Sequence, residues 1–445
     1  MESSERVVLQ FTYLFDSREG KHMNGFSQND IFTQALGLVE PWFVSQVEFQ
    51  PSEKDPERLD VHITLDYQGG SKFPCPKCGE LSPVYDSNQK EWRHLNFFQY
   101  RCYIHARVPR VECKDHKVRL VDVPWAKPGS GFTLLMEAVL LTMLRQMSVS
   151  QVARQVGEHD TRLWRLLTGF VHEALDSQDF SDVEDIGVDE YSHKGHNYIT
   201  VFLAHPSKER DKARVLYTTE GKDNSTVTRF DEEFKLKKGD PDKVKNITCD
   251  MTHGFRNAMQ TAFPKATTTV DRFHVMKMAN DEVDNVRRRE NRSKDKKKGK
   301  ALDKTRYLWL KNRDNLTEDQ QKQLDLLLET DYLDTVTAYN FRLRLQDVYA
   351  SSDYGTAVES YEALCLDLSN SSIWEMQKLG KSLIRNAVEI LNFFDSRKTN
   401  AVLEGFNSVI SLIKRKARGF KNMDNFMAMI YFVCGGLELP KATIM

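Results

Sequence analysis

The amino-acid sequence predicts a multidomain α/β protein, and three observations support this prediction. The chain has 445 residues, enough for roughly two to four domains with cores of their own. Four of the seven cysteines lie between residues 75 and 113, which indicates a small metal-bound domain toward the start of the chain. Farther on, mixed strand and helix patterns give way to residues 285–395, where the periodicity is helical only.

The composition is that of an ordinary globular protein. Hydrophobic residues make up 40% of the chain and charged residues 29%, and the net charge of −1 excludes a uniformly basic surface. There is no run of about 18 apolar residues and no signal-peptide pattern, so we expect a cytoplasmic protein. Residues 1–22 fit no later pattern, and Met23 is a candidate for the natural start.

The cysteine cluster predicts a zinc ribbon that holds one structural zinc ion. A CxxC pair and a CxxH pair can close a tetrahedral Cys3His site, formed by Cys75, Cys78, Cys113 and His116. Cys102 and His105 have the same CxxH spacing, but Cys102 falls inside an alternating strand pattern, whereas Cys113 ends one. The alternative is that the cysteines are unrelated, reduced and buried.

A helix-turn-helix pattern follows the zinc ribbon. A short helical stretch ends at Gly157, and a longer helix begins at Asp160. Arg162 and Arg165 lie near the start of this second helix, where a recognition helix contacts base edges. A plain helical hairpin without DNA contact is the alternative interpretation.

The next part of the chain predicts a mixed sheet. Three consecutive strands ("VEDIGVDEYS", "NYITVFLAH" and "ARVLYTTE") are followed by a helix, the strand "KVKNITCDM", a second helix and the strand "ATTTVD". The order βββαβαβ is typical of an RNase H-like sheet. Residues 285–395 would then be a long all-helical insertion before the last helices of this core.

Three acidic residues meet near one end of this sheet in the expected topology. Asp189 follows apolar residues of the first strand, and Asp250 ends the fourth strand, which is its neighbour. Glu404 lies on an amphipathic helix and is the only acid among seven Lys or Arg between Ser396 and Met423. Each acid alone is more typical of an ordinary solvated residue, and it is their placement on these elements that suggests a site.

Converging carboxylates of this kind predict divalent metal ions. Like charges at close range raise one another's pKa unless a cation neutralises them. Mg2+ (two ions, or Mn2+) is the natural occupant, and two such ions catalyse in-line phosphoryl transfer. Glu190 is expected on the opposite face of the sheet from Asp189 and is therefore not predicted to be a ligand.

Two short segments are strongly basic. "RRRENRSKDKKKGK" (287–300) holds nine Lys or Arg in fourteen residues, and "KRKARGFK" (414–421) holds five in eight. Charge runs are usually solvated faces, but either segment could contact DNA phosphates. The candidate contacts are Arg287, Arg288, Arg289, Lys414, Arg415 and Arg418.

Several longer stretches resemble the ISL3 family of bacterial insertion-sequence transposases. They include "SKFPCPKCG", "VECKDH", "QVARQVG", "IGVDEYSHKGHNYITVF", "DMTHGFRNAMQTAFPKATTTVDRFHVMKMAN" and "TNAVLEGFNSVISLIKRKARGF". They occur in the expected order between about residues 40 and 430. The resemblance implies an RNase H-like DDE transposase in which Asp189, Asp250 and Glu404 form the catalytic triad.

The resemblance further implies cut-and-paste transposition in the bacterial nucleoid. The protein would bind terminal inverted repeats as a homodimer on double-stranded DNA, cleave the element ends and join the 3′-hydroxyls to target DNA. The expected domains are an N-terminal segment (1–60), a zinc ribbon (61–124), a helix-turn-helix (125–180), a first core part (181–284), the helical insertion (285–395) and the last core helices (396–445).

Two further pairs of residues have open roles. Asp271 and His274 of "VDRFHV" follow a strand near the expected site and would either orient a ligand or phosphate or serve the fold. Trp309 and Trp374 would either stack on an unpaired base or, as we favour, pack in a core. The rival functions are a zinc-ribbon transcription regulator, which would bind DNA without cutting it, and another RNase H-like nuclease, which would cut without joining.

Overall fold

The structure, a computed structural model, describes residues 27–440 except 54, 195–196, 208–209, 251–252, 294 and 399–400. The possible extension over residues 1–22 and the candidate start at Met23 lie outside the described residues. The chain forms two compact units, one that runs up to Leu166 and one that spans Leu167–Glu438. Within the described part of the chain, no helix combines the length and the apolar character that crossing a membrane requires.

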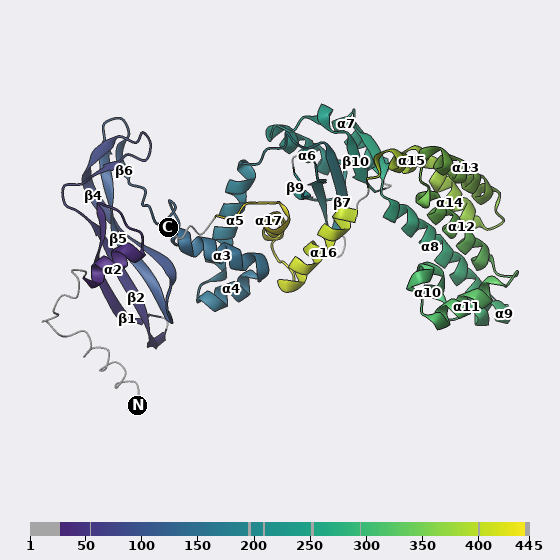
Figure 1. Cartoon of the computed structure of the whole chain (residues 1–445), viewed down its shortest axis with the longest axis horizontal. Coiled ribbons are helices and arrows are strands. Elements are labelled where there is room, and N and C mark those ends of the chain that lie inside the picture. The colour runs from purple at the N-terminus through teal and green to yellow at the C-terminus, as the bar shows by residue number, and fades with distance from the viewer. Residues whose placement is uncertain are drawn as a thin grey trace. The chain divides into compact units, whose positions relative to one another are not determined.

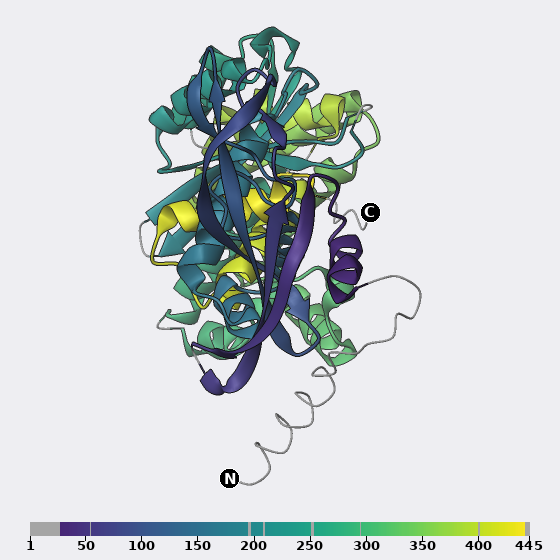
Figure 2. The ribbon, with the colours of Figure 1, turned by 90° about the vertical axis from the view of Figure 1, so that its left-hand side faces the viewer.

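A six-stranded sheet dominates the first unit (Figures 1 and 2). In spatial order its strands are β1 (Trp42–Ser52), β2 (Asp55–Tyr67), β5 (Tyr100–Cys113), β4 (Leu81–Phe97) and β3 (Lys72–Pro74), with β6 (Lys117–Leu120) paired to β5. Strand alternation puts Val61, Ile63 and Leu65 of β2 on a buried face. The helix α2 (Gln28–Ala35) starts with a capping box at Ser27 and packs beside β1.

Three helices follow this sheet: α3 (Leu134–Gln146), α4 (Val149–Val156) and α5 (Asp160–Asp176). Gly157, between α4 and α5, has a φ of 73°, a left-handed conformation that glycine adopts without strain. Leu163 of α5 is fully buried and holds the helix in place. The short helix, glycine turn and second helix predicted from the sequence are therefore present.

A five-stranded mixed sheet lies in the second unit. In spatial order its strands are β11 (Thr267–Val270), β10 (Asn246–Cys249), β7 (Asp185–Lys194), β8 (Asn197–Ala204) and β9 (Arg214–Glu220). β7, β8 and β9 form an antiparallel meander, whereas β10 runs parallel to both β7 and β11. The order of strands and helices along the chain is the βββαβαβ order that the sequence predicts.

Helices cover both faces of this sheet (Figure 1). They are α6 (Asn224–Leu236), α7 (His253–Ala262), α16 (Ala401–Lys416) and α17 (Met423–Cys434), and a short 3-10 helix, η1 (Pro241–Lys243), follows α6. On the face of α6 and α7, Val188 joins a core in which the rings of Phe202 and Phe230 stack with centroids 4.1 Å apart. On the other face, α16 lies along β7, with Leu403 against Gly187.

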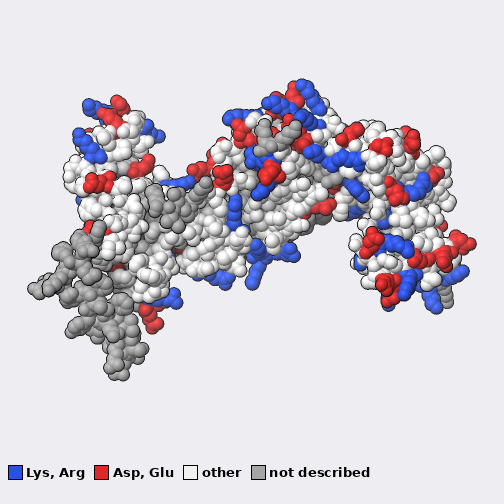
Figure 3. Space-filling view, viewed as in Figure 1, with Lys and Arg blue, Asp and Glu red and all other residues white. Residues whose placement is uncertain are grey.

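A helical region follows β11. It contains α8 (Arg272–Asn291), α9 (Lys296–Leu302), α10 (Arg306–Leu310), η2 (Arg313–Asn315), α11 (Glu318–Leu328), α12 (Asp334–Ala350), α13 (Tyr354–Asn370), α14 (Trp374–Arg385) and α15 (Ala387–Ser396). The helices share a core of their own, in which Trp309 is fully buried against Tyr339. α15 returns to the sheet, where the Asn392 side chain donates a hydrogen bond to the carbonyl of Thr268 on β11 (2.9 Å). Acidic and basic side chains are mixed over most of the surface in Figure 3.

Candidate active site and metal centre

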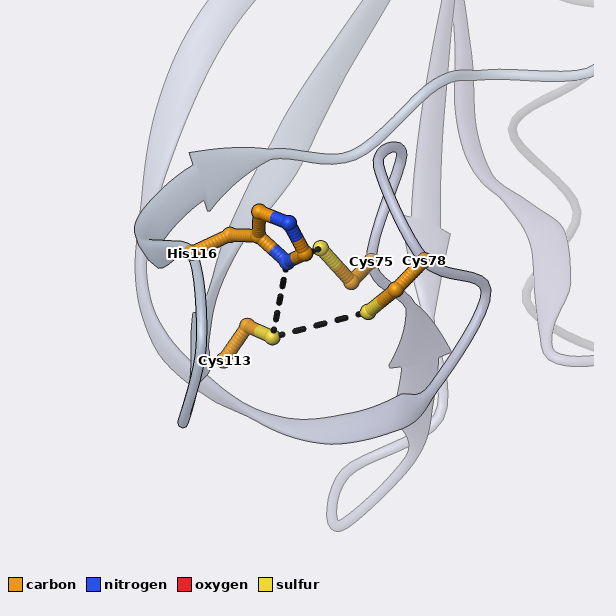
Figure 4. Close-up of side chains that lie close together, drawn as sticks. All are labelled: Cys75, Cys78, Cys113 and His116. Carbon is orange, nitrogen blue, oxygen red and sulfur yellow. Dashed lines mark hydrogen bonds between the residues drawn. The ribbon is translucent and has the colours of Figure 1, made fainter.

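Four side chains of the first unit converge as a metal-binding group would. One ligand atom from each of Cys75, Cys78, Cys113 and His116 lies within 4.8 Å of the others (Figure 4). Within the described residues, this is the only group of three or more Cys, His, Asp or Glu that meets this distance. Cys75 and Cys78 come from the turn between β3 and β4, Cys113 ends β5, and His116 lies in the turn before β6.

Local backbone structure shapes the first turn. Gly79 has a φ of 76° and donates its N–H to the carbonyl of Cys75 (2.8 Å), which folds the CxxC segment back on itself. The backbone N–H of Lys77 lowers the pKa of the Cys75 thiol, which favours the thiolate that binds metals. The turn that carries Cys75 and Cys78 therefore depends on a glycine and on backbone N–H donors.

The spacing of these four ligands fits zinc. Tetrahedral Zn2+ with Zn–S of about 2.3 Å and Zn–N of about 2.0 Å requires S–S edges of about 3.8 Å and S–N edges of about 3.5 Å. The Cys78 and Cys113 sulfurs are 3.7 Å apart, and Nδ1 of His116 is 3.6 Å from the Cys113 sulfur and 3.9 Å from the Cys75 sulfur. Four protein ligands leave no open position, so an ion here would be structural.

The alternative CxxH pair, Cys102 and His105, does not belong to this metal-binding group. Cys102 is buried in the core of the six-stranded sheet, and burial raises the pKa of its thiol to about 11. Nε2 of His105 lies 2.8 Å from Nδ1 of His62, and neither side chain belongs to the cysteine group. The position of Cys102 inside a strand accounts for this separation.

Asp189 and Asp250 are brought together by the pairing of β7 and β10. The register pairs Thr248 with Gly187, so two residues farther along each chain Asp250 comes beside Asp189. The electrostatics agree with this placement. Burial raises the pKa of Asp189, and the charge of Asp250 raises it further.

Glu404 reaches the same region because α16 approaches β7 closely. A Cβ atom on Gly187 would lie only 3.1 Å from Cδ1 of Leu403, so a glycine here lets the helix pack closely against the strand. Glu404, next to Leu403, is exposed, and its pKa is raised by partial burial and then by the charges of Asp271 and Asp189. Asp189 thus interacts electrostatically with both Asp250 and Glu404, but the three acids do not form a group as tight as that of the cysteines.

Asp271 and His274 also belong to this region. Asp271, only 3% exposed, is the residue before α8, and its Oδ2 lies 3.2 Å from Nδ1 of His274. This hydrogen bond raises the pKa of His274, and the charges of Asp250 and Asp189 raise it as well. His274 therefore lies among carboxylates whose charges favour its protonated form.

Glu190 follows Asp189 and, by strand alternation, shares the sheet face of Val188. The Glu190 side chain is half-buried. Burial raises its pKa, and so does the charge of Asp250. Glu190 thus contributes to the negative potential near Asp250 although it lies on the other face of β7.

Asn407 was not among the residues predicted for the site. Its Nδ2 donates a hydrogen bond to Oδ2 of Asp189 (2.7 Å). Asn407 is three residues after Glu404 and therefore on the same side of α16, which is the only signal in the sequence that could have identified it.

The predicted DNA-contact residues of the helix-turn-helix differ in their surroundings. The guanidinium of Arg162 donates to Glu158 (2.6 Å) and to the carbonyl of Gly131 (2.9 Å), and it lies over the ring of Phe132. Arg165 is exposed on α5. The partners of Arg162 indicate a role in holding the turn, whereas Arg165 remains a candidate for DNA contact.

The arginines of the first basic segment make ion pairs within the helical region. Arg287 is 8% exposed, and both it and Arg288 bond Asp284 at 2.7 Å. Arg289 bonds Glu375 at 2.8 Å and Asp334 at 3.0 Å. These partners favour a structural role for the three arginines.

The second basic segment ends α16. Lys414 donates a hydrogen bond to the carbonyl of His193, next to the ring of Tyr191. Arg415 and Arg418 are exposed and have no acidic partner among the described residues. Trp309 is a core residue, as we favoured, but Trp374 is 59% exposed.

Three segments of the chain match known protein families. Residues 186–430, more than half of the chain, match the DDE family of ISL3 transposases. Residues 121–171 match the helix-turn-helix domain of transposase family ISL3, which confirms the predicted helix-turn-helix. Residues 71–116 match the zinc-finger of the transposases IS204, IS1001, IS1096 and IS1165, so the chain contains a zinc-ribbon domain.

Curated relatives match nearly the whole chain. The chain is 26% identical over 406 residues to the transposase for insertion sequence element IS1001 of Bordetella parapertussis, which covers 89% of this chain and 96% of the relative. It is 25% identical over 443 residues to the transposase for insertion sequence element IS1557 of Mycobacterium tuberculosis, which covers 91% and 95%. From the order of its domains and the length of these matches, the chain belongs to the ISL3 family of insertion-sequence transposases.

Proposed function

We propose that this transposase moves its insertion sequence by a cut-and-paste reaction. It would cleave DNA at the element ends and join the freed 3′-hydroxyls to target DNA. The observation that carries the proposal is the approach of three acids that are far apart in the sequence. Asp250 follows β10, which pairs with β7 of Asp189, and Asn407, one turn after Glu404 on α16, donates a hydrogen bond to Asp189.

These residues fit divalent cations. Asp189, Asp250 and Glu404 would hold them, because carboxylate oxygens are the ligands that Mg2+ prefers. The raised pKa values of Asp189 and Glu404 come from burial and then from neighbouring acids, and a bound cation relieves both effects. Two Mg2+ or Mn2+ ions, when bound, would neutralise charge on the attacking and leaving oxygens of an in-line displacement.

Asp271 and His274 would serve the same reaction. The hydrogen bond from Nδ1 of His274 to Asp271 keeps the proton on that nitrogen and favours the imidazolium form. A cationic imidazole beside the carboxylates would bind an oxygen of the scissile phosphate and share its negative charge. Asp271 would act only by holding His274 in this position.

The core that holds these groups is proposed to be RNase H-like, with residues 285–395 as a helical insertion. The strand order β11-β10-β7-β8-β9, with three antiparallel strands followed by two parallel ones, supports this assignment. We retain the domain limits 1–60, 61–124, 125–180, 181–284, 285–395 and 396–445 as part of the proposal.

DNA would be bound by the zinc ribbon, by the helix-turn-helix and by the C-terminal end of α16. The zinc ribbon, with Zn2+ as its structural ion, and the helix-turn-helix would bind the terminal inverted repeats, with Arg165 among the contacts. Arg415 and Arg418 would contact backbone phosphates, and Lys and Arg side chains gather at this end of α16 (Figure 3). A homodimer on DNA would hold both element ends for a joint reaction.

The test is strand transfer from a labelled duplex that carries one element end, with Mg2+ or Mn2+. We expect Asp250→Ala and Glu404→Gln to bind the duplex as the parent does, because neither change touches the zinc ribbon or the helix-turn-helix. Cleavage and joining should both fall by at least about 100-fold, since charge stabilisation in the transition state is lost. Unimpaired cleavage by either variant would remove that residue from the site.

The parent protein also separates the rival functions. A transcription regulator would shift the labelled duplex in a gel and leave it uncut under every metal condition. A nuclease of another kind would cut the duplex without joining the 3′-hydroxyl to a target. Either result would overturn the proposed reaction.

A further inference from the structure

Helix α16 packs against β7 through regularly spaced contacts on one face of the strand. Leu403 lies against Gly187, and Asn407 bonds Asp189. The contacts continue farther along: the Ser411 hydroxyl lies 3.2 Å from that of Tyr191, and Lys414 bonds the carbonyl of His193. Steps of three or four residues along the helix match steps of two along the strand, because both advance by roughly 5–7 Å.

The Asn407 contact fixes the carboxylate of Asp189. One carboxylate oxygen, Oδ2, accepts from Nδ2 of Asn407 at 2.7 Å, and the other, Oδ1, accepts from the backbone N–H of Glu190 at 2.8 Å. A donor on each oxygen sets the plane of the carboxylate and leaves further lone pairs on both oxygens for a cation. The amide orientation is also determined, because a carboxylate can only accept.

The oxygen of the Asn407 amide lowers the stability of the fold. This oxygen, Oδ1, is buried and accepts no hydrogen bond from the described residues. Leaving a buried acceptor unpaired costs about 1–3 kcal/mol. Packing of α16 alone would therefore be served better by an apolar residue, and the bond to Asp189 is what the asparagine provides.

We infer that Asn407 is a positioning residue that orients the Asp189 carboxylate for divalent-metal binding. This inference rests on the proposed function, in which Asp189 is a metal ligand. Asn407 does not itself touch the cation or the reacting phosphate. Its effect comes from holding Asp189 on β7 in register with Glu404, three residues earlier on α16.

The experiment measures Mn2+ binding to the full-length protein without DNA, from the electron paramagnetic resonance signal of free Mn2+. We expect Asn407→Ala to raise the Kd about 10- to 100-fold, the usual effect of removing the partner of a metal ligand. The matched control is Ser411→Ala, which removes the hydrogen bond between α16 and Tyr191 but touches no carboxylate. It should leave the Kd within about twofold, although it lowers the thermal stability of the protein by removing a hydrogen bond of the same helix.

Each outcome bears on one claim. Equal Kd values for Asn407→Ala and the parent, or an equal rise in both Asn407→Ala and Ser411→Ala, would overturn the positioning role. If Asp189→Ala leaves Mn2+ binding unchanged, the proposed metal site itself is wrong. Should Asn407→Ala fail to fold, Asn407→Ser also removes the amide, and the same Kd comparison applies to it.

Discussion

The two basic segments of the chain, residues 287–300 and 414–421, have similar charge densities but different surroundings. In the first, Arg287, Arg288 and Arg289 all face acidic side chains of the helical region. In the second, Arg415 and Arg418 are exposed without an acidic partner among the described residues. Arg415 and Arg418 therefore have cationic charge that a phosphate backbone could neutralise, whereas the charges of Arg287, Arg288 and Arg289 are already paired.

The difference comes from acids that the fold buries. Asp284 and Glu375 are 4% and 1% exposed, and a buried carboxylate needs a cationic partner. Glu290 lies within the first segment, is 3% exposed, and accepts hydrogen bonds from the backbone of Asp334 and Thr335 at the start of α12. The first segment thus serves the packing of the helices around α8.

The largest effect that separates the segments is expected from Arg289→Ala. This change leaves the Glu375 carboxylate buried without its cationic partner, and we expect a loss of about 3 kcal/mol in the free energy of unfolding. Urea unfolding followed by circular dichroism measures the loss. Adding Glu375→Gln should restore part of the stability, because the buried charge is then removed.

Arg288→Ala is the matched control for this measurement. Arg288 is half-exposed, and its partner Asp284 keeps Arg287 and Arg306 after the change. The expected cost is about 0.5 kcal/mol or less. If Arg289→Ala were no more costly than Arg288→Ala, the structural role of the first segment would be wrong.

The second-largest expected effect is a pH-dependent contribution of Glu290 to the free energy of unfolding. Burial alone would raise its pKa, but hydrogen bonds from Thr335, Lys298 and Asp334 outweigh burial and lower it. A lowered pKa in the folded state means that the ionised form adds stability above the ordinary value of 4.5, and this stability is lost as the pH falls through the lowered pKa.

Glu290→Gln should therefore cost about 2 kcal/mol at pH 7, because the amide cannot accept all of these hydrogen bonds. The difference in the free energy of unfolding from the parent should narrow as the pH falls below about 4.5, where Glu290 of the unfolded parent begins to be protonated while the folded carboxylate is still ionised. Urea unfolding at several pH values measures both. A difference that stays constant down to pH 3 would show that ionisation of Glu290 contributes nothing.

Patterns that are local in the sequence predicted much of this molecule. The CxxC and CxxH spacings identified the four residues that now lie together, because each pair is built within one turn. Apolar alternation predicted the strands of the mixed sheet, and the position of Asp250 at the end of its strand placed it beside Asp189. These features need no knowledge of distant partners.

What the sequence could not predict depends on pairs that are remote along the chain. Arg289 and Glu375 are 86 residues apart, and Asn407 and Asp189 are 218 apart. No periodicity links such residues. The sequence of a basic segment therefore does not show whether its arginines pair with buried acids or remain exposed to solvent. Gly187 is a similar case, since a Cβ atom there would be crowded by His205, Leu203 and Leu403, and Leu403 lies far from it in the sequence.

The smallest effect, and the one that tests the second segment, is a change in the salt dependence of DNA binding. Arg415→Ala and Arg418→Ala should each reduce the slope of log K against log salt concentration by about 1, because one phosphate contact is lost. Neither should change the free energy of unfolding by more than about 0.5 kcal/mol, since neither arginine has an acidic partner among the described residues. Fluorescence anisotropy of an end duplex at several salt concentrations measures the slope.

Arg288→Ala is again the control, since it removes a surface arginine of the first segment. Its slope should equal that of the parent, because the charge of Arg288 is already neutralised by Asp284 and has no counterion to release. A reduced slope for Arg288→Ala would mean that phosphate competes with Asp284 for this arginine. The two basic segments would then differ in degree rather than in kind, and the helical region would face the DNA through α8.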